Sequence, residues 1–249
     1  MITFNAVTKI FSPGTPYALS VLQGVDLHVE KGTSCVILGH SGVGKSVLLK
    51  VLLGLISLTS GDIIVGGLSV RDRTHRNAYR HHFGMLFQGG ALFDSMTILG
   101  NIVFSLVERG ISRPKATEIA HEKLAAVKLE ERVCSLFPSE LSGGMQKRAA
   151  LARAIALEPK ILLFDEPTTG LDPVTGANIT YLLRDTIRTL GATAITITHD
   201  LAATRVLADR VCLLDAKKIA WQGTRQELDV TDNPLIVSFL KAARGELDS

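Results

Sequence analysis

The stretch Gly39-His40-Ser41-Gly42-Val43-Gly44-Lys45-Ser46 fits the pattern G-x-x-x-x-G-K-[ST] of a phosphate-binding loop. The apolar residues 34–38 before it are typical of a buried strand, and residues 47–53 after it are typical of a helix. Glycines let backbone N–H groups turn toward phosphate oxygens, and a helix N-terminus adds positive potential at the same place. This context favours a nucleotide site over the alternative, a glycine turn in front of an ordinary core helix.

The loop also predicts which atoms hold a nucleoside triphosphate and its magnesium ion. We expect the whole loop, and Val47 directly after it, to contact the phosphates. Lys45 would supply positive charge to the β- and γ-phosphates, and the Ser46 hydroxyl would be a Mg²⁺ ligand.

Composition narrows the class of protein. The chain has 249 residues, of which 46% are hydrophobic, so one large domain or two small lobes can be built. The net charge is only +3, which gives no electrostatic reason to expect a nucleic-acid partner. The cysteines Cys35, Cys134 and Cys212 are scattered, and the apolar surroundings of Cys35 and Cys212 predict buried, reduced thiols.

No signal peptide is visible at the start of the sequence. The longest apolar run, residues 47–58, contains Lys50 and is shorter than the ~20 residues that span a bilayer. We therefore expect a soluble, cytoplasmic protein whose membrane role, if any, comes through a partner.

The hydrophobic pattern predicts an α/β chain. Strands are expected at residues 2–4, 22–29, 34–38, 60–67, 83–88, 161–164, 194–198 and 210–214. Helices are expected at residues 47–53, within 97–136 (most clearly 115–128), and at 144–157, 175–190, 201–207 and 233–243. The early strands suit a small antiparallel β layer, and the later alternation suits a parallel sheet with helices on both faces. Residues 71–82 are rich in Arg and His, and we interpret them as a solvated helix face in preference to a nucleic-acid or lipid-headgroup patch.

Two carboxylates follow the apolar strand predicted at residues 161–164. Asp165 would hold Mg²⁺, and Glu166 would orient and deprotonate the attacking water, a role that is typically worth ~10²–10⁴ in rate. The alternative is that Asp165 and Glu166 only cap the next helix. A phosphate-binding loop in the same chain favours the catalytic interpretation.

The sequence Leu141-Ser142-Gly143-Gly144 opens another helix. Ser142 is a good N-cap, and the exposed N–H groups of such a terminus suit phosphate. L-S-G-G is also the signature motif of ATP-binding cassette (ABC) ATPases, and the chain resembles that family over nearly its whole length, with the motifs in the family's order. The resemblance implies a P-loop NTPase fold in three parts. These are a β layer at about residues 1–31 and 60–82, a RecA-like core at about 32–59, 83–94 and 146–249, and a helical subdomain at about 95–145.

The same resemblance implies roles for further residues. Gln88 resembles the glutamine that contacts Mg²⁺ and water, Asp172 resembles the D-loop aspartate, and His199 resembles the switch histidine that contacts the γ-phosphate. Ser142, Gly143 and Gly144 would contact the nucleotide held by a partner chain. Phe11 aligns with the aromatic residue that stacks on adenine, and Tyr17 is the rival candidate because a proline-glycine insertion follows Phe11.

Within the ABC family, residues 85–93, 137–145 and 149–159 resemble the ATPases of the Mla (maintenance of lipid asymmetry) phospholipid transporters, the MCE-associated group. Met145 replaces the usual signature glutamine, as it does in that group. The resemblance implies ATP and Mg²⁺ as cofactors and a second copy of the chain as partner. It also implies membrane permease subunits, an MCE-domain protein, a small STAS-domain protein, and a place on the cytoplasmic face of a bacterial inner membrane.

The catalytic motifs leave another transporter class open, an importer ATPase for a polar solute such as an amino acid. A chromosome or DNA-repair ATPase is disfavoured because the segment between Lys45 and Ser142 shows no sustained heptads. A regulatory cassette without hydrolysis is disfavoured by intact Lys45, Asp165, Glu166 and His199.

Overall fold

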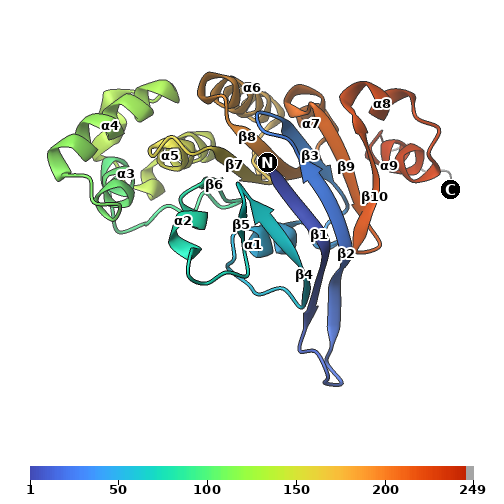
Figure 1. Ribbon diagram of the computed structural model, residues 1–249. Helices are drawn as coiled ribbons and strands as arrows, with labels where there is room; N and C mark the ends of the chain where they lie inside the picture. Colours follow the sequence, from blue (N-terminus) through green and yellow to red (C-terminus); the bar gives the residue numbers. More distant parts are fainter. Residues whose placement is uncertain (245–249) are drawn as a thin grey trace.

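A central six-stranded sheet carries the fold. The computed structural model of the protein describes residues 1–244, and Figure 1 shows this sheet running through the middle of the molecule. Its strands are, in spatial order, β10 (Lys218–Thr224), β9 (Arg210–Asp215), β3 (Ser34–Leu38), β8 (Thr193–Thr198), β7 (Ile161–Asp165) and β6 (Phe83–Leu86). All neighbours pair in parallel except β9 and β10, which are antiparallel. Every residue of β3, β7 and β8 is buried, as expected for parallel strands covered on both faces.

A second, antiparallel sheet lies over one side of the first. Its order is β2 (Leu19–Val29), β1 (Ile2–Phe11), β4 (Ser60–Val65) and β5 (Leu68–Ser69). The hairpin formed by β1 and β2 projects away from the rest of the molecule (Figure 1). This confirms the antiparallel β layer expected from the sequence.

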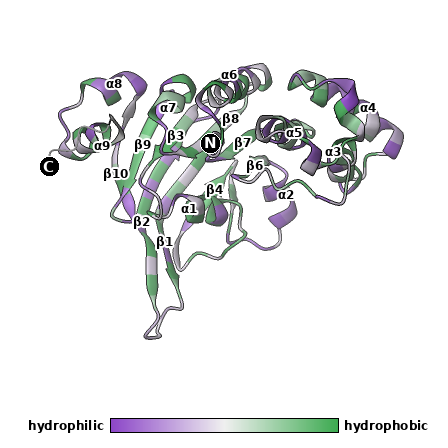
Figure 2. Ribbon diagram, turned by 180° about the vertical axis from the view of Figure 1, so that it is seen from behind, coloured by the Kyte–Doolittle hydropathy of each residue, from purple (hydrophilic) through white to green (hydrophobic). Residues whose placement is uncertain are grey.

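Helix α1 (Lys45–Leu52) lies between the two sheets. Its buried residues share one hydrophobic cluster with Phe4 and Ile63 of the antiparallel sheet and with Ile37 of the central sheet. Alternate residues of β3 point in opposite directions, so Val36 and Leu38 belong to a second cluster on the other face. Apolar residues therefore dominate the central strands, while α2 (Arg76–Arg80) is polar (Figure 2).

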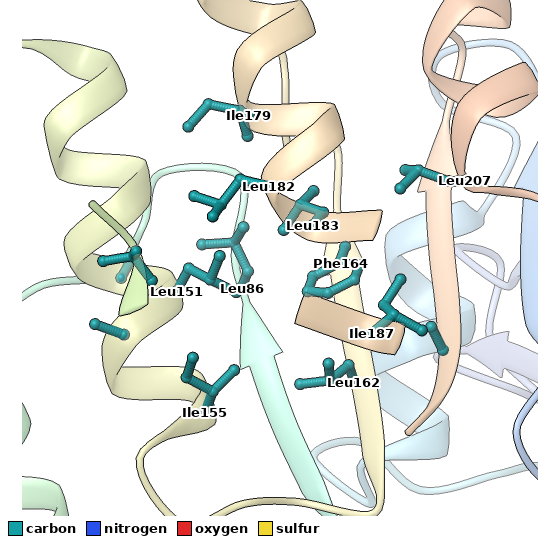
Figure 3. Packing of buried hydrophobic residues seen from close by; sticks show 14 of the residues in the cluster. Leu86, Leu151, Ile155, Leu162, Phe164, Ile179, Leu182, Leu183, Ile187 and Leu207 are labelled. Carbon is teal, nitrogen blue, oxygen red and sulfur yellow. The ribbon is translucent and has the colours of Figure 1, made fainter. Parts of the chain in front are cut away.

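Helices from the second half of the chain cover the second cluster. Leu151 and Ile155 of α5 (Gly143–Ile155) pack near Leu86, and α6 (Pro173–Leu190) covers Phe164 (Figure 3). The remaining helices of this side are α7 (Leu201–Leu207), α8 (Arg225–Val230) and α9 (Pro234–Arg244). The cluster continues without a break into the helical block of the middle of the chain.

That helical block consists of α3 (Ile98–Val107), α4 (Arg113–Ala126) and the 3₁₀ helices η1 (Glu131–Ser135) and η2 (Pro138–Glu140). Gly110, with φ of +85°, follows the end of α3, and Pro114 lies in the first turn of α4. In Figure 1, α3 and α4 lie at the opposite end of the molecule from α8 and α9. The region expected to be helical thus forms two α-helices and two short 3₁₀ turns.

Some expectations of secondary structure were wrong or incomplete. The sequence pattern gave no element for residues 215–232, yet β10 and α8 lie there. Ala216 and Lys217, at φ of +43° and +70°, make a tight turn. The residues that usually predict such a turn, glycine or an Asn-Gly pair, are absent from it. Strand β10 is only partly buried, so its hydrophobic alternation is weak.

The basic stretch adopts less helix than its composition suggested, since α2 has five residues. Arg71, Arg73 and Arg76 are exposed, and the first two lie before the helix. Cys35 and Cys212 are buried free thiols, as expected, with their Sγ atoms 3.8 Å apart. Among the described residues, no helix is both long and apolar enough to cross a bilayer.

Gly84 of β6 offers a direct test of how the central sheet meets α5. A Cβ atom at this position would lie 2.2 Å from the carbonyl oxygen of Ala154, so an added methyl group cannot fit without a backbone shift. We expect Gly84→Ala to lower the free energy of unfolding by about 1–3 kcal/mol. Gly89→Ala, where no atom lies within 4 Å, is the control and should change it by less than ~0.5 kcal/mol in urea denaturation. Equal stability of the two variants would contradict this packing.

Candidate nucleotide-binding and hydrolysis site

A cavity of about 530 Å³ lies where the phosphate-binding loop, the loop after β6 and the end of β7 meet. It is lined by Phe11, Leu19, Val21, Ser41, Gly42, Gly44, Lys45, Ser46, Val47, Gln88, Glu166, Thr169 and His199. The carboxyl ends of parallel strands meet at one edge of a sheet, which explains why segments so far apart in the sequence converge here. Most residues that the sequence singled out are therefore brought together.

The loop has the backbone shape that phosphate binding needs. Gly42 and Gly44 have φ of +80° and +111°, a region that favours glycine. A Cβ on Gly39 would lie 2.7 Å from the carbonyl oxygen of Leu214, so this glycine permits close packing of the loop on β9. His40 is exposed and lies outside the cavity lining, with its ring 5.2 Å from the ring of Phe239 in α9. Val43 packs against the hydrophobic cluster around α1.

Lys45 is buried at the base of the cavity. Its Nζ atom donates to the carbonyl oxygens of Gly39 at 2.6 Å and His40 at 3.1 Å, and lies 3.3 Å from Glu166 Oε1. A buried ammonium group needs such partners because burial alone penalises a charge. The same ammonium group can neutralise phosphate oxygens that enter the cavity, so the residues fit a nucleoside triphosphate.

Asp165 and Ser46 form the candidate magnesium site. Ser46 Oγ donates to Asp165 Oδ1 at 3.2 Å, so a hydroxyl oxygen and a carboxylate oxygen lie side by side beside the loop. Burial raises the pKa of Asp165 above its usual value, and the Ser46 hydrogen bond opposes that shift. Ser46 lines the cavity, whereas Asp165 is buried and is not among the lining residues. Two adjacent hard oxygen donors suit Mg²⁺, which retains several waters and uses few protein ligands.

Glu166 is held from several sides. Its Oε2 atom lies 2.9 Å from His199 Nδ1 and accepts from the hydroxyls of Thr169 at 3.3 Å and Thr198 at 3.4 Å. Its backbone has φ of +46°, and its N–H donates to the carbonyl oxygen of Ile197. A non-glycine residue in this region is strained by about 1–3 kcal/mol, and such strain is typical of functional sites. His199 is half exposed and reaches the same cavity.

Gln88 lies just beyond the end of β6, exposed and lining the cavity. Its carbonyl oxygen accepts a hydrogen bond from Nζ of Lys147, a buried lysine of α5. Burial lowers the pKa of Lys147, while the charges of Asp165 and Glu166 act in the opposite direction. The sequence analysis did not identify Lys147. The available signal was its spacing, because Gly144, Lys147 and Leu151 share the buried face of α5.

The structure distinguishes the two aromatic residues that were candidates for stacking on adenine. Phe11 lines the cavity, with Lys9 Nζ 4.7 Å from the centre of its ring. Tyr17 is 85% exposed and lies outside the lining. Leu19 and Val21 of β2 also line the cavity, and the sequence analysis did not single them out. Phe11 is thus the better placed of the two aromatic residues for stacking on a base.

The signature residues lie outside the cavity that holds the phosphate-binding loop. Ser142 caps α5, accepting from the N–H of Met145 at 3.4 Å, and it does not line the cavity of its own chain, nor do Gly143 and Gly144. A Cβ on Gly144 would lie 2.6 Å from Thr175 Cγ2, so this glycine permits α5 and α6 to approach closely. Asp172 caps α6 and lines a neighbouring cavity of about 770 Å³, which His199 also borders.

Comparison with known proteins agrees with this arrangement. Residues 22–169 match the family model described as ABC transporter. The chain belongs to the ABC transporter family. It is an ATP-binding subunit of that family and an ATPase that uses ATP with Mg²⁺. The signature and the phosphate-binding loop predicted from the sequence therefore identified the family correctly.

Two relatives and one solved structure are each similar to this chain over most of its length. The glutamine transport ATP-binding protein GlnQ of Escherichia coli is 41% identical over 230 residues, which cover 92% of this chain and 93% of GlnQ. The probable ribonucleotide transport ATP-binding protein mkl of Mycobacterium tuberculosis is 39% identical over 250 residues, 98% of this chain and 67% of mkl. The dimeric ATP-binding cassette MJ0796, solved with ADP and Pi, matches with a TM-score of 0.82 and 31% identity, covering 90% of this chain and 99% of MJ0796.

Lys147 provides a test of the link between α5 and Gln88. Lys147→Met removes the donor to the Gln88 carbonyl, and hydrogen bonds to charged groups are worth ~1.5–3 kcal/mol. We expect kcat for ATP hydrolysis to fall ~10-fold or more, with little change in KM because Lys147 does not line the cavity. Lys147→Arg should restore part of the rate.

Arg148→Met is the matched control, because Arg148 lies on the same helix and donates to the carbonyl oxygen of Val127, far from Gln88 along the chain. Steady-state kinetics of the purified variants measures the difference. An equal loss of rate in both variants would show that Lys147 only stabilises the fold.

Proposed function

We propose that this chain is the motor subunit of a membrane transporter, that it works as a dimer with shared nucleotide sites, and that its cargo is phospholipid. The observation that supports shared sites is the position of Ser142, Gly143 and Gly144 outside the cavity of their own chain. Ser142 caps an exposed helix N-terminus, which is suited to phosphate. A second copy would bring that terminus over this chain's Lys45 and complete the site.

In the proposed reaction, Glu166 acts as the general base. One carboxylate oxygen receives the proton of the water that attacks the γ-phosphate, and His199 and Thr169 hold the carboxylate in place. Lys45 neutralises the charge that develops on the phosphate oxygens, and Ser142 of the second copy adds hydrogen-bond donors. Ser46, Asp165 and Gln88 would hold Mg²⁺, which supplies charge neutralisation when bound.

Glu166→Gln tests the base. The amide keeps the shape of the side chain but cannot accept the proton, so hydrolysis should fall by ~10²–10⁴ while ATP binding remains. ATP should then hold the variant as a closed dimer in analytical ultracentrifugation. Glu118→Gln, on the exposed surface of α4, is the control and should behave as wild type. Hydrolysis by Glu166→Gln near the wild-type rate would show that another group is the base.

An apolar surface that includes the end of the loop after Gln88 supports docking of a permease. Phe93 and Phe104 are 45% and 39% exposed, and their ring centres lie 5.3 Å apart. Val107, on the same helix α3 as Phe104, is also exposed. Arg153 of α5 lies over the Phe93 ring at 5.7 Å and donates to the carbonyl oxygen of Gly90, so the surface is joined to α5. A helix end of a permease could cover these rings and so contact the loop that carries Gln88.

Phospholipid as cargo is supported by the resemblance of residues 85–93, 137–145 and 149–159 to the Mla group, including Met145 in the signature. In this proposal, the complex contains permease subunits, an MCE-domain protein and a small STAS-domain protein at the cytoplasmic face of an inner membrane. The second candidate is import of a polar solute. The 41% identity to GlnQ, whose name specifies glutamine transport, favours it.

Affinity purification of the tagged chain from detergent-extracted membranes distinguishes the two candidates. An MCE-domain protein should copurify with a permease if the cargo is phospholipid, whereas a periplasmic solute-binding protein without an MCE-domain protein would contradict that cargo. Phe104→Asp should release the permease because it places a charge on the docking surface. Val230→Asp, at an 81% exposed position of α8, is the control and should keep it.

A further inference from the structure

Three donor side chains of different chemistry converge in the helical block, outside the nucleotide site. They are His121 of α4 and Glu131 and Cys134 of η1. His121 Nδ1 lies 3.1 Å from Glu131 Oε1 and 3.7 Å from Cys134 Sγ. Ligand atoms of all three residues lie within 4.8 Å of one another.

The backbone explains why these groups meet. A 3₁₀ helix has three residues per turn, so Glu131 and Cys134 lie one above the other on the same side of η1. Val133 of η1 and Leu124 of α4 are buried in the same hydrophobic cluster, which fixes η1 against α4. His121 is partly buried and faces η1 from α4. Packing that is independent of any ligand thus places the three donors together.

The donor set has a clear chemical preference. Imidazole nitrogen, cysteine sulfur and carboxylate oxygen are the ligands of Zn²⁺, which binds them at about 2.0–2.3 Å in tetrahedral geometry. Tetrahedral angles at those bond lengths place neighbouring donor atoms about 3.3–3.8 Å apart. The two separations from His121 Nδ1, 3.1 Å to Glu131 Oε1 and 3.7 Å to Cys134 Sγ, are close to this range. Mg²⁺ prefers oxygen donors, so this cluster differs in kind from the pair formed by Ser46 and Asp165.

We propose that His121, Glu131 and Cys134 form a Zn²⁺ site, with water as the fourth ligand on the exposed side of Glu131. The ion would join α4 to η1 by direct bonds. Ser142 follows Cys134 by eight residues, so the site would anchor the start of the segment that leads into the signature. Its role is structural, because none of the three residues lines the nucleotide cavity.

Co²⁺ serves as the probe because it takes the same geometry and absorbs visible light. Titration of the full-length, nucleotide-free protein should show one equivalent of tetrahedral Co²⁺ with a thiolate-to-metal charge-transfer band, and Zn²⁺ should displace it. Cys134→Ser should abolish that band. Since loss of an outer-shell partner already costs a metal site ~10–100-fold in affinity, loss of a direct ligand in Glu131→Gln or Cys134→Ser should cost at least as much.

Glu130→Gln is the matched control, because Glu130 neighbours Glu131 but pairs with Arg132. Zn²⁺ should raise Tm of the wild type and of Glu130→Gln, and it should leave Tm of Cys134→Ser unchanged. A charge-transfer band that survives in Cys134→Ser would point to another thiol and overturn the proposal. An octahedral Co²⁺ spectrum without such a band would show that His121 and Glu131 form only an ion pair.

Discussion

The parallel pairing of β3, β8 and β7 is the constraint on which the site depends. Leu38 pairs with Thr198, and Asp165 pairs with Ile197, so the three strands end at nearly the same level. The next residue of each chain segment then enters the cavity region. The loop with Lys45, the carboxylate of Glu166 and the ring of His199 are thus set side by side by register alone. A shift of one residue in any strand would turn these side chains to the other face of the sheet.

The register also explains how a strained and charged residue is tolerated. Glu166 is buried, its φ is +46°, and its N–H donates to the carbonyl oxygen of Ile197, which continues the ladder between β7 and β8 one residue further. Burial of its charge is balanced by Lys45 and by hydroxyls of Thr169 and Thr198. The surrounding groups therefore hold the carboxylate in one position, which is the preorganisation that the proposed general base needs.

Site residues that belong to a local sequence pattern could be predicted without the structure. Lys45 and Glu166 follow apolar strands, and such strand ends are recognisable without a structure. Lys147 could not be recognised in the same way, because its importance comes from the crossing of α5 over the loop after β6. The choice between Phe11 and Tyr17 depended on the path of the β1–β2 hairpin. The donors at His121, Glu131 and Cys134 match no standard metal-site spacing, and only the packing of η1 on α4 brings them together.

Helix α5 connects the signature to the loop that follows β6. Its N-terminus presents Ser142, and five residues later Lys147 donates to the carbonyl oxygen of Gln88. Further along, Arg153 holds the carbonyl oxygen of Gly90 and lies over Phe93. The loop of residues 88–93 is therefore attached to the same helix, α5, that begins at the signature. A displacement of that loop, whether by a nucleotide at Gln88 or by a partner on Phe93, must move Ser142 or break these contacts. In a dimer with shared sites, this connection would couple the two nucleotide sites to each other and to the docked partner. The coupling would need no contact between the two nucleotides.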